Sequence, residues 1–240
     1  MIMTNQWNRL ESIYGQVVLQ KLQGSTVFLC GLGGVGSNCL NVLARSAISN
    51  FVLVDFDTVD PSNINRQAVA RLDTVGRPKT QVAKKDVLNI NSNAKVEVFD
   101  KKLDADNTYE FLESVNAKLP FDFVLDCIDC IPAKVEIARF AQDKNIPIIS
   151  SMGAAEKFDN FAIQLADLYD TYNCPLAKSF RHQAKKAGIK YLPVVFSAEE
   201  QDTEKVSSSR KTGTPLGTTS YLPTLFGIHM AAECIKHLIK

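Results

Sequence analysis

A glycine-rich segment constrains the fold of this chain more than any other part of its sequence. The segment GLGGVG follows the apolar run STVFLC (25–30) and precedes the helical stretch SNCLNVLARSAI. In the pattern G-x-G-x-x-G, Gly31 permits a tight turn, Gly33 lets the backbone approach a phosphate, and Gly36 lets the helix pack closely on the strand. The segment therefore predicts a strand–turn–helix unit that binds a nucleotide. A glycine turn without a ligand is the less favoured interpretation.

Apolar segments recur along the first 152 residues, with helical spacing between them. The expected strands are residues 25–30, 51–55, 95–99, 121–126 and 146–151. Several of them are apolar on both faces, which is typical of a parallel sheet covered by helices on both sides. A helical pattern also opens the chain and ends at Gly24. We therefore predict an α/β fold, a Rossmann-like, mostly parallel sheet with helices on both faces.

After residue 152 the pattern changes, and we expect an extension of the sheet rather than further strand–helix repeats. NFAIQLAD (160–167) and LPVVFS (192–197) predict antiparallel strands, and PLAKSFRHQAKKAG (175–188) predicts a helix. A C-terminal helix is expected from about Tyr221. The sheet is thus predicted to be extended by antiparallel strands and a C-terminal helix.

One polar stretch separates the last expected strand from the last helix. It covers about residues 199–216 and is too long for a simple connector, so it predicts a flexible crossover loop. We interpret residues 1–240 as a single domain. Its nucleotide-binding core is expected at 1–152, and 153–240 is expected to be a substrate-binding extension.

Composition and charge restrict the kind of partner that the chain can bind. With 27 Lys and Arg against 26 Asp and Glu the formal net charge is +1, so a polyanion has to be bound by a local patch. The N-terminal segment lacks the long apolar core of a signal peptide, and no apolar run approaches the roughly 20 residues of a membrane span. We therefore expect a cytoplasmic protein without a transmembrane segment.

The cysteines are scattered rather than paired. Cys127 and Cys130 have CxxC spacing, but no second pair completes a four-thiolate zinc site. A redox pair is an alternative, and two small core residues at a strand end are the favoured interpretation. Cysteines in this arrangement are typical of reduced thiols in a cytosolic protein.

A second polar segment, DFDTVDPSNINRQ (55–67), directly follows the apolar run FVLV. Asp55 lies 24 residues after Gly31 at a strand end, where a carboxylate accepts hydrogen bonds from ribose hydroxyls. Ribose binding needs only this carboxylate, and it suits NAD as well as ATP. The glycine turn and Asp55 therefore leave two alternatives open, a dehydrogenase that uses NAD and an enzyme that uses ATP.

Further polar side chains are expected at the same edge of the sheet. They are Asn63, Arg66, Gln67, Lys79, Asp126 and Asp129. Hydride transfer does not need a guanidinium, an ammonium and an extra carboxylate around the phosphates. Attack at the α-phosphorus of a triphosphate does, because charge builds on its oxygens and on the departing pyrophosphate. Arg66 and Lys79 would neutralise that charge while a carboxylate holds Mg²⁺. The pattern therefore favours adenylation.

Four segments together resemble the ubiquitin-activating-enzyme-like superfamily of ATP-dependent adenylating enzymes, which includes the molybdopterin and thiamine sulfur-carrier activators. They are GLGGVGS (31–37), DFDTVDPSNINRQ (55–67), VGRPK (75–79) and DCID (126–129). The resemblance implies ATP and Mg²⁺ as cofactors. It implies catalytic roles, with Asp129 as the Mg²⁺ ligand, for Arg66, Lys79, Asp129 and Arg9. It implies ATP binding by Gly31, Gly33, Gly34, Gly36, Asp55, Asp57, Asn63 and Gln67.

The N-terminal helix also takes part in this resemblance. Members of the superfamily insert an arginine from the N-terminal helix of a partner subunit, and Arg9 in WNRLES lies where that residue falls. The resemblance therefore implies a homodimer in which Arg9 is supplied across the interface.

One branch of the superfamily fits better than the others, namely the tRNA threonylcarbamoyladenosine dehydratases. The resemblance to this branch extends through residues 147–189 and 214–238. The sulfur-carrier activators generally have a paired CxxC…CxxC site, which this sequence lacks, so no zinc is expected. The branch implies ATP-dependent cyclisation of threonylcarbamoyladenosine in tRNA, with adenylation of the threonyl carboxylate and release of AMP. Activation of a ubiquitin-like sulfur-carrier protein and a nucleotide-binding scaffold without catalysis are the alternatives.

The helix expected at 175–188 offers a surface for tRNA. Lys178, Arg181 and Lys185 share one helical face, with His182 and Lys186 beside it. No Asp or Glu occurs between residues 171 and 198. Contact between this face and RNA phosphates is one interpretation. An ordinary solvated amphipathic helix is the other.

Overall fold

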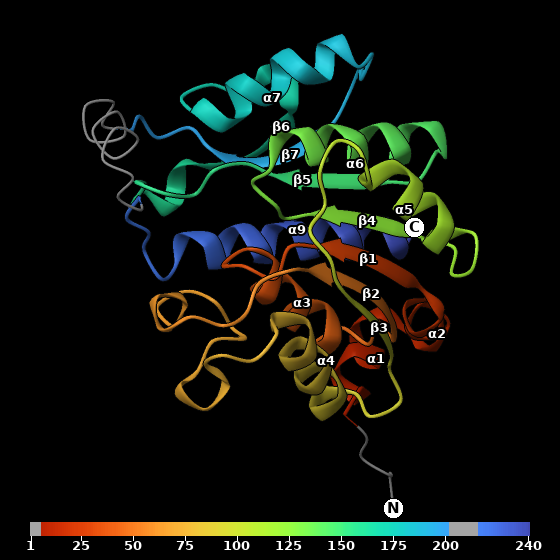
Figure 1. Cartoon of the computed structure of the whole chain (residues 1–240). Helices are drawn as coiled ribbons and strands as arrows, with labels where there is room; N and C mark the ends of the chain where they lie inside the picture. The colour runs from red at the N-terminus through yellow and green to blue at the C-terminus, as the bar shows by residue number, and fades with distance from the viewer. Residues whose placement is uncertain (1–5, 202–215) are drawn as a thin grey trace, which may run out of the picture.

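The computed structural model describes residues 6–201 and 216–240, which form one sheet between two layers of helices (Figure 1). The strands are β1 (Thr26–Cys30), β2 (Asn50–Asp55), β3 (Lys95–Asp100), β4 (Phe123–Asp126), β5 (Ile148–Ser151), β6 (Ile163–Asp167) and β7 (Pro193–Ser197). Their order across the sheet is β3-β2-β1-β4-β5-β7-β6. The predicted α/β fold with a mostly parallel sheet is confirmed.

The C-terminal extension of the sheet differs in one respect from the prediction. β7, expected to be antiparallel, pairs parallel with β5, and only β6 runs against its neighbour. The reason is topological. The chain passes from β5 through β6 and α7 before it enters β7, and a crossover of that length returns the strand to the direction of the others. The antiparallel edge is thus a single strand.

Helices cover both faces of the sheet. They are α1 (Asn8–Tyr14), α2 (Gln16–Gly24), α3 (Gly36–Arg45), α4 (Lys79–Ile90), α5 (Thr108–Asn116), α6 (Ile131–Asp143), α7 (Pro175–Lys186) and α9 (Leu222–Leu238). Side chains of α3, α4 and α9 share one core cluster, and those of α5, α6 and α7 form two clusters on the other face. Among the described residues no helix combines the length and apolar character that crossing a bilayer requires.

The alternation of side chains along β1 explains why the sheet has two cores. Val27 and Leu29 belong to the cluster under α3, α4 and α9, whereas Phe28 and Cys30 belong to the cluster under α5 and α6. Successive strand residues point to opposite faces, so a strand that is apolar throughout is stable only when both faces are covered. The uniformly apolar run STVFLC therefore fits this architecture.

The helical pattern at the N-terminus forms two helices rather than the single predicted one. Gly15 separates α1 from α2 with φ of 78° and ψ of 163°. These angles lie outside the helical region and are accessible mainly to glycine. Only α2 buries residues against the core, namely Leu19 and Leu22. Because of this break at Gly15, the axis of α1 does not have to follow the axis of α2.

A buried ion pair joins the middle of the sheet to α6. The ammonium of Lys134 lies 2.8 Å from a carboxylate oxygen of Asp126, and both side chains are 0% exposed. Lys134 also donates to the carbonyl of Ser151 at 2.9 Å, and Ser150 donates its hydroxyl to Asp126. A buried charge is tolerated only when it is paired and hydrogen-bonded. This network therefore fixes the carboxyl ends of β4 and β5 relative to α6.

The glycine turn brings two pieces of backbone into direct contact. A Cβ atom on Gly36, the first residue of α3, would collide with the carbonyl oxygen of Gly31. Gly31 has φ of +89°, and a Cβ there would lie 2.8 Å from the carbonyl oxygen of Cys127. Both roles predicted from the G-x-G-x-x-G pattern, the tight turn and the close helix–strand packing, are therefore present in the backbone.

Substitution of Gly36 by Ala should destabilise the fold because backbone atoms, unlike flexible side chains, cannot move aside. We expect a loss of about 2–3 kcal/mol in the free energy of unfolding, or roughly 5–10 °C in Tm. Gly24→Ala is the matched control, because no atom lies within 4 Å of a Cβ at the end of α2. Thermal denaturation of both variants tests this, and equal Tm values would contradict the close contact.

Candidate active site

A cavity of about 920 Å³ lies at the carboxyl ends of the parallel strands, at the left edge of the sheet in Figure 1. Most of the residues that the sequence singles out line it. They are Gly31, Gly33, Gly34, Asp55, Asp57, Asn63, Arg66, Gln67, Lys79 and Asp129. Open α/β sheets bind their ligands at this edge, where the order of strands reverses between β1 and β4. Gly36 does not line the cavity but contacts the carbonyl group of Gly31 in the turn. Arg9 lies on α1 and does not line the cavity either.

Asp55 ends β2 and points back toward the glycine turn. One carboxylate oxygen accepts the Leu32 N–H at 2.6 Å, and the other accepts the Asp57 N–H at 2.8 Å. Burial raises the pKa of Asp55 above its ordinary value, and the two N–H donors oppose this shift. The carboxylate is therefore held in one orientation at the cavity wall, and its remaining lone pairs can accept hydrogen bonds from hydroxyl groups.

Lys79 is the first residue of α4, and its ammonium is almost fully buried. It lies 2.9 Å from the Asp57 carboxylate, whose side chain is 47% exposed. The backbone N–H of Lys79 also donates to the Asp57 carbonyl at 3.0 Å. Two contacts with the same residue fix the lysine at the cavity. A phosphate group that enters can share this charge, because an ammonium has three donors.

The segment after β2 forms a 3₁₀ turn, η1 (Pro61–Asn63), that positions the next polar groups. The side chain of Asp60 accepts the Ser62 N–H at 2.8 Å and caps this turn. Arg66 then donates from Nη1 to the Ser62 carbonyl at 2.9 Å and to Asn65 Oδ1 at 2.7 Å. Only one end of the guanidinium is used by these bonds, so its other N–H groups remain for an anion.

Gln67 carries an indication of a ligand that does not depend on motifs. Its side chain is buried in the cavity wall, and its Oε1 atom has no hydrogen-bond partner among the described residues. An acceptor left without a partner costs about 1–3 kcal/mol, so buried acceptors are nearly always satisfied. A bound molecule that donates a hydrogen bond at this position would remove that cost.

The two carboxylates of DCID differ in position. Asp126, expected at the ligand edge together with Asp129, is instead buried in the ion pair with Lys134 and does not line the cavity. Asp126 is the last residue of β4, as predicted, but it is not open to a ligand, because α6 provides a buried lysine opposite it that the sequence does not reveal. Asp129 is exposed at the cavity wall.

The donor set at Asp129 bears on whether the cavity suits a metal ion. The described residues contain no group of three or more His, Cys, Asp or Glu side chains that could hold one. Zinc sites require such a group, whereas Mg²⁺ is usually held by one or two carboxylates together with substrate phosphates and water. Asp129 lines the same cavity as Arg66 and Lys79, so this donor set is compatible with Mg²⁺ that arrives with a triphosphate.

The opposite wall of the cavity comes from the C-terminal extension and from residues that the sequence analysis did not single out. They include residues 151–155 and 174–176, Ser179, Gln201 and Leu216, whereas Pro223 lines the cavity beside Gly34. Two exposed lysines after β3, Lys101 and Lys102, also line the cavity. Lys102 lies 5.5 Å from the ring centroid of the exposed Phe56. Two adjacent lysines directly after an expected strand are the sequence feature that could have indicated Lys101 and Lys102 as cavity residues.

A buried lysine supports that opposite wall. Lys157 is 1% exposed, and its ammonium donates to the carbonyls of Asn173, Ser197 and Glu199 at 3.1, 2.6 and 2.9 Å. Burial lowers its pKa. The three carbonyls belong to the start of α7 and the end of β7, so one ammonium holds both segments. The only sequence feature that could have indicated this buried lysine is the adjacent charged pair in GAAEKFD (153–159).

Both ends of the predicted crossover loop are fastened to the same segment. Near its start, Gln201 donates to the carbonyl of Ala155. Just after its end, the Gly217 carbonyl accepts the Glu156 N–H at 2.9 Å, and the Gly217 N–H donates to the Glu156 carboxylate. Residues 202–215 lie outside the described part of the chain. The loop prediction therefore stays a prediction.

Two of the thiols that line the cavity, Cys30 and Cys127, are not activated. Burial raises the pKa of Cys127 and Cys30 well above the ordinary value of a thiol, and the nearby Asp126 carboxylate adds to the shift. A thiol rather than a thiolate is a poor nucleophile. The structural interpretation of these cysteines is thus consistent with their surroundings.

Arg9 lies away from the cavity within one chain. It is exposed on α1, and no residue of α1 lines the cavity. In Figure 1 α1 lies below the sheet near α4, whereas the strand tips point to the left. Arg9 therefore does not line the cavity of its own chain, and its predicted role stays a prediction.

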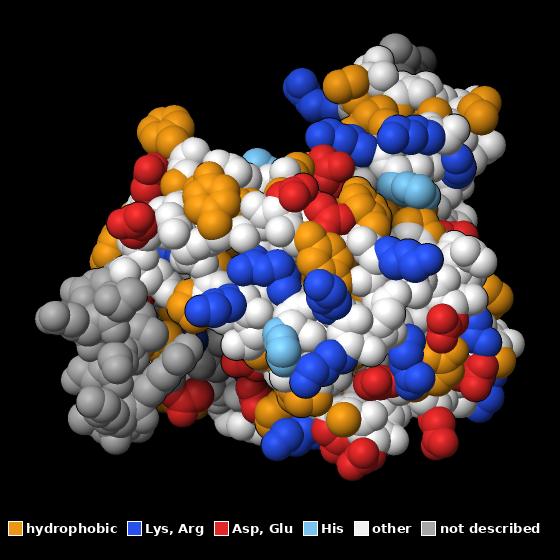
Figure 2. Space-filling view, turned by 90° about the horizontal axis from the view of Figure 1, so that it is seen from above, with side chains coloured by type: hydrophobic (Ala, Val, Ile, Leu, Met, Phe, Trp, Pro, Cys, Tyr) orange, Lys and Arg blue, Asp and Glu red, His pale blue; other side chains and the backbone are white. Residues whose placement is uncertain are grey.

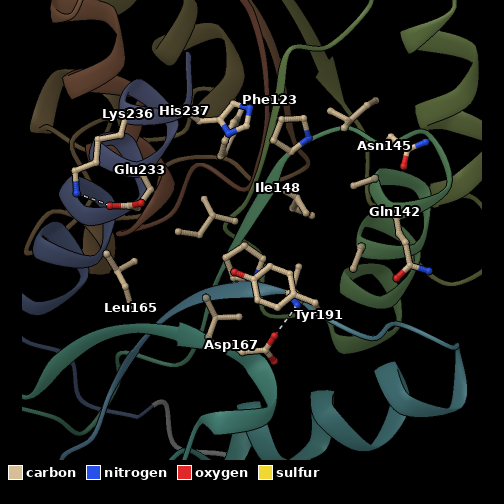
Figure 3. A pocket seen from close by; sticks show the side chains of 18 of the residues that line it. Phe123, Gln142, Asn145, Ile148, Leu165, Asp167, Tyr191, Glu233, Lys236 and His237 are labelled. Atoms are coloured by element: carbon tan, nitrogen blue, oxygen red, sulfur yellow. Dashed lines mark hydrogen bonds and ion pairs between the residues drawn. The ribbon is translucent and has the colours of Figure 1, made fainter. Parts of the chain in front are cut away.

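A second cavity of about 950 Å³ opens at the amino ends of β5 and β7, between α6 and α9 (Figure 3). None of the predicted site residues lines it. Several of its charged groups are paired within the protein, including Glu233 with Lys236 at 2.6 Å and Asp167 with the Leu192 N–H. The two cavities are similar in volume, so their chemistry and not their size distinguishes the candidate active site.

The chain is similar to proteins of known function along almost its whole length. The tRNA threonylcarbamoyladenosine dehydratase of Bacillus subtilis is 35% identical and covers 99% of this chain and 96% of its own. The Saccharomyces cerevisiae tRNA threonylcarbamoyladenosine dehydratase 2 is 37% identical over 80% of this chain, which corresponds to 42% of the yeast protein.

Solved structures give the same relationship in three dimensions. Crystal structures of the Escherichia coli tRNA N6-threonylcarbamoyladenosine dehydratase in complex with AMP and with ATP have TM-scores of 0.85 and 26% identity, and the match covers 99% of this chain and 97% of theirs. The model of the ThiF family matches residues 4–240. On this match, which covers the glycine turn, the polar loop after β2 and the extension, the chain belongs to the ThiF family.

Proposed function

We propose that the protein is an ATP-dependent dehydratase of threonylcarbamoyladenosine in tRNA. The observation that carries the proposal is the cavity itself. It combines a glycine turn, a ribose-type carboxylate and two cations in a chain similar over its full length to dehydratases that bind AMP and ATP. We further propose that it acts in the cytoplasm, where tRNA and ATP are both available.

The reaction consists of two substitutions. The threonyl carboxylate of the modified nucleoside attacks the α-phosphorus of ATP, a P–O bond forms, and pyrophosphate leaves. The carbamoyl part of the same side chain then attacks the activated carbonyl carbon, and AMP leaves. The carbamoyl group loses a proton and the carboxylate loses an oxygen to AMP, so the net change is loss of water from the nucleoside. Ring closure within one held side chain has the advantage of an intramolecular reaction.

Residues at the glycine turn and after β2 are proposed to hold the nucleotide. The backbone around Gly31, Gly33 and Gly34 and the start of α3 face the phosphates with N–H groups and the positive end of the helix dipole. Asp55 accepts from ribose hydroxyls, and the unpaired Oε1 of Gln67 accepts a further donor from the bound molecule. Asp57 and Asn63 complete this wall.

The charged residues are proposed to act on the transition state. Arg66 and Lys79 both line the cavity and neutralise charge on the α-phosphate and on pyrophosphate. Asp129 would hold Mg²⁺, which when bound neutralises phosphate charge and orients the triphosphate. Lys79 changes partner from Asp57 to phosphate when the nucleotide enters, and Asp57 is exposed enough to be solvated alone.

Release of AMP from ATP distinguishes the proposal from its alternatives. The protein is incubated with ATP and Mg²⁺ and with threonylcarbamoyl-modified tRNA, unmodified tRNA, a ubiquitin-like sulfur-carrier protein, or no addition. We expect AMP only with the modified tRNA, together with loss of 18 Da from the nucleoside, the mass of one water. AMP that appears only with the carrier protein would replace the proposal by carrier activation.

Arg66→Ala should abolish most of the AMP formation while the fold persists. The side chain lines the cavity and is only half-buried, so the loss should fall mainly on catalysis and amount to roughly 10²–10³-fold in kcat. Arg45→Ala is the matched control, because Arg45 is exposed at the end of α3 and, among the described residues, its side chain donates only to Asn41 on its own helix. Near-normal turnover of Arg66→Ala with modified tRNA would contradict the assigned role.

We also propose that the enzyme is a homodimer and that Arg9 of one subunit completes the site of the other. In support, Arg9 is exposed on α1 and away from the cavity of its own chain. Complementation tests this proposal. Arg9→Ala and Arg66→Ala should each be nearly inactive, and subunit exchange between them should restore about one quarter of the wild-type activity, because half the dimers then hold one intact site. A mixture that stays inactive after verified exchange would contradict a role across the interface.

A further inference from the structure

The exposed side of α7 combines positive charge with a direct connection to the cavity. Its first turn is part of the cavity wall, through Cys174, Pro175, Leu176 and Ser179. The next turns carry the exposed side chains Lys178, His182, Lys185 and Lys186, which we name the α7 ridge. From above, Lys and Arg side chains gather beside a histidine on the face that α7 forms (Figure 2). The ridge thus starts at the active site and leads away from it.

Packing fixes which residues of α7 form the ridge. Ala177, Phe180 and Ala184 are buried against the sheet and α6, so the lysines at the other positions of the helix must face solvent. Arg181, expected on the same face, is instead half-buried and donates from Nη1 to the Thr171 carbonyl at 2.6 Å. The structure therefore removes Arg181 from the predicted basic surface and assigns it to the segment before α7.

The ridge is a local concentration of charge on a nearly neutral protein. Residues 171–198 contain five of the 27 Lys and Arg residues, namely the three ridge lysines, Arg181 and Lys190, and none of the 26 Asp and Glu residues. The rest of the chain therefore has 22 basic and 26 acidic residues. An excess of this kind on one surface is the electrostatic footprint of a polyanion site, because a solvated face normally has both signs interspersed.

We propose that the α7 ridge binds the phosphate backbone of tRNA and thereby directs the modified nucleoside into the adjacent cavity. This inference rests on the proposed function. From Lys178 to Lys186 the helix rises about 12 Å, enough to follow a backbone away from the cavity rather than to hold a single anion. Lysines bind phosphates as point charges and without base specificity, so they suit positioning.

An aromatic ring at the base of the ridge favours RNA over an acidic carrier protein. Tyr172 lies two residues before the first cavity residue of this segment, and its side chain is 48% exposed. Its ring rests edge-on against Phe196 at 5.5 Å and is thereby held in place. Single-stranded RNA loops are recognised by phosphate contacts together with bases stacked on aromatic side chains. An exposed ring beside a row of lysines therefore has the two features of a single-stranded RNA site.

The test compares two triple variants that remove the same charge. The ridge variant is Lys178→Gln, Lys185→Gln and Lys186→Gln, and the control is Lys21→Gln, Lys85→Gln and Lys118→Gln, which are exposed lysines on or after α2, α4 and α5. Gln keeps helical propensity and avoids new repulsion, so both proteins should fold. Circular dichroism and the affinity for ATP check that the core and the cavity are intact.

Affinity for tRNA, KM for modified tRNA and kcat at saturation are measured between 50 and 200 mM salt. For the ridge variant we expect roughly tenfold or greater loss in affinity and the same rise in KM, with kcat little changed. The slope of log affinity against log salt should also fall by about one for each lysine that contacts a phosphate. The control should match the wild type.

The outcomes separate the two proposals. If the wild type forms AMP with modified tRNA but the ridge and control variants have equal KM values and equal salt slopes, the ridge is not the tRNA surface and the proposed function stands. If the wild type neither binds tRNA nor responds to it, and responds instead to a carrier protein, both proposals fail.

Discussion

The contact between the backbones of Gly31 and Gly36 is the constraint on which the site depends. It sets how closely α3 approaches β1, and hence where the first N–H groups of α3 point relative to the end of the strand. Asp55 adds to the arrangement by accepting the Leu32 N–H within the turn. β1, the glycine turn, α3 and β2 are thus joined by contacts between backbone atoms that have little freedom to move. These contacts determine the shape of the cavity wall.

The nucleotide half of the molecule could be predicted from sequence because its determinants are local. The glycine spacing, the apolar strands and the polar loop after β2 each determine the structure of nearby residues only. Asp55, Arg66 and Lys79 then meet because they follow strands that end at the same side of the sheet. The buried lysines could not be predicted in this way. Lys134 and Lys157 are stabilised by Asp126 and by carbonyl groups on other elements, and no sequence pattern indicates these partners. For the same reason Asp126 and Arg181 were assigned to the wrong surroundings.

The second half of the molecule shows how an extension can reshape a common fold. β6 and β7 widen the sheet beyond β5, α7 covers one face of the new strands, and the first turn of α7 closes the cavity on the side opposite the glycine turn. Lys157 fastens this wall by bonding to the start of α7 and to the end of β7. The glycine turn and the wall formed by the extension therefore belong to different segments of the chain, so one can change in sequence while the other is kept.

The uneven charge of the chain also affects how it meets other molecules. A protein with net charge of +1 exerts little attraction at distances beyond the Debye length, which is about 8 Å at physiological ionic strength. The lysines of α7 therefore act only at short range and in one orientation, whereas a uniformly basic protein would be retained by any nucleic acid in the cell. Concentrating the charge on one helix keeps encounters with unsuitable RNA brief and makes each productive encounter begin with the cavity facing the partner.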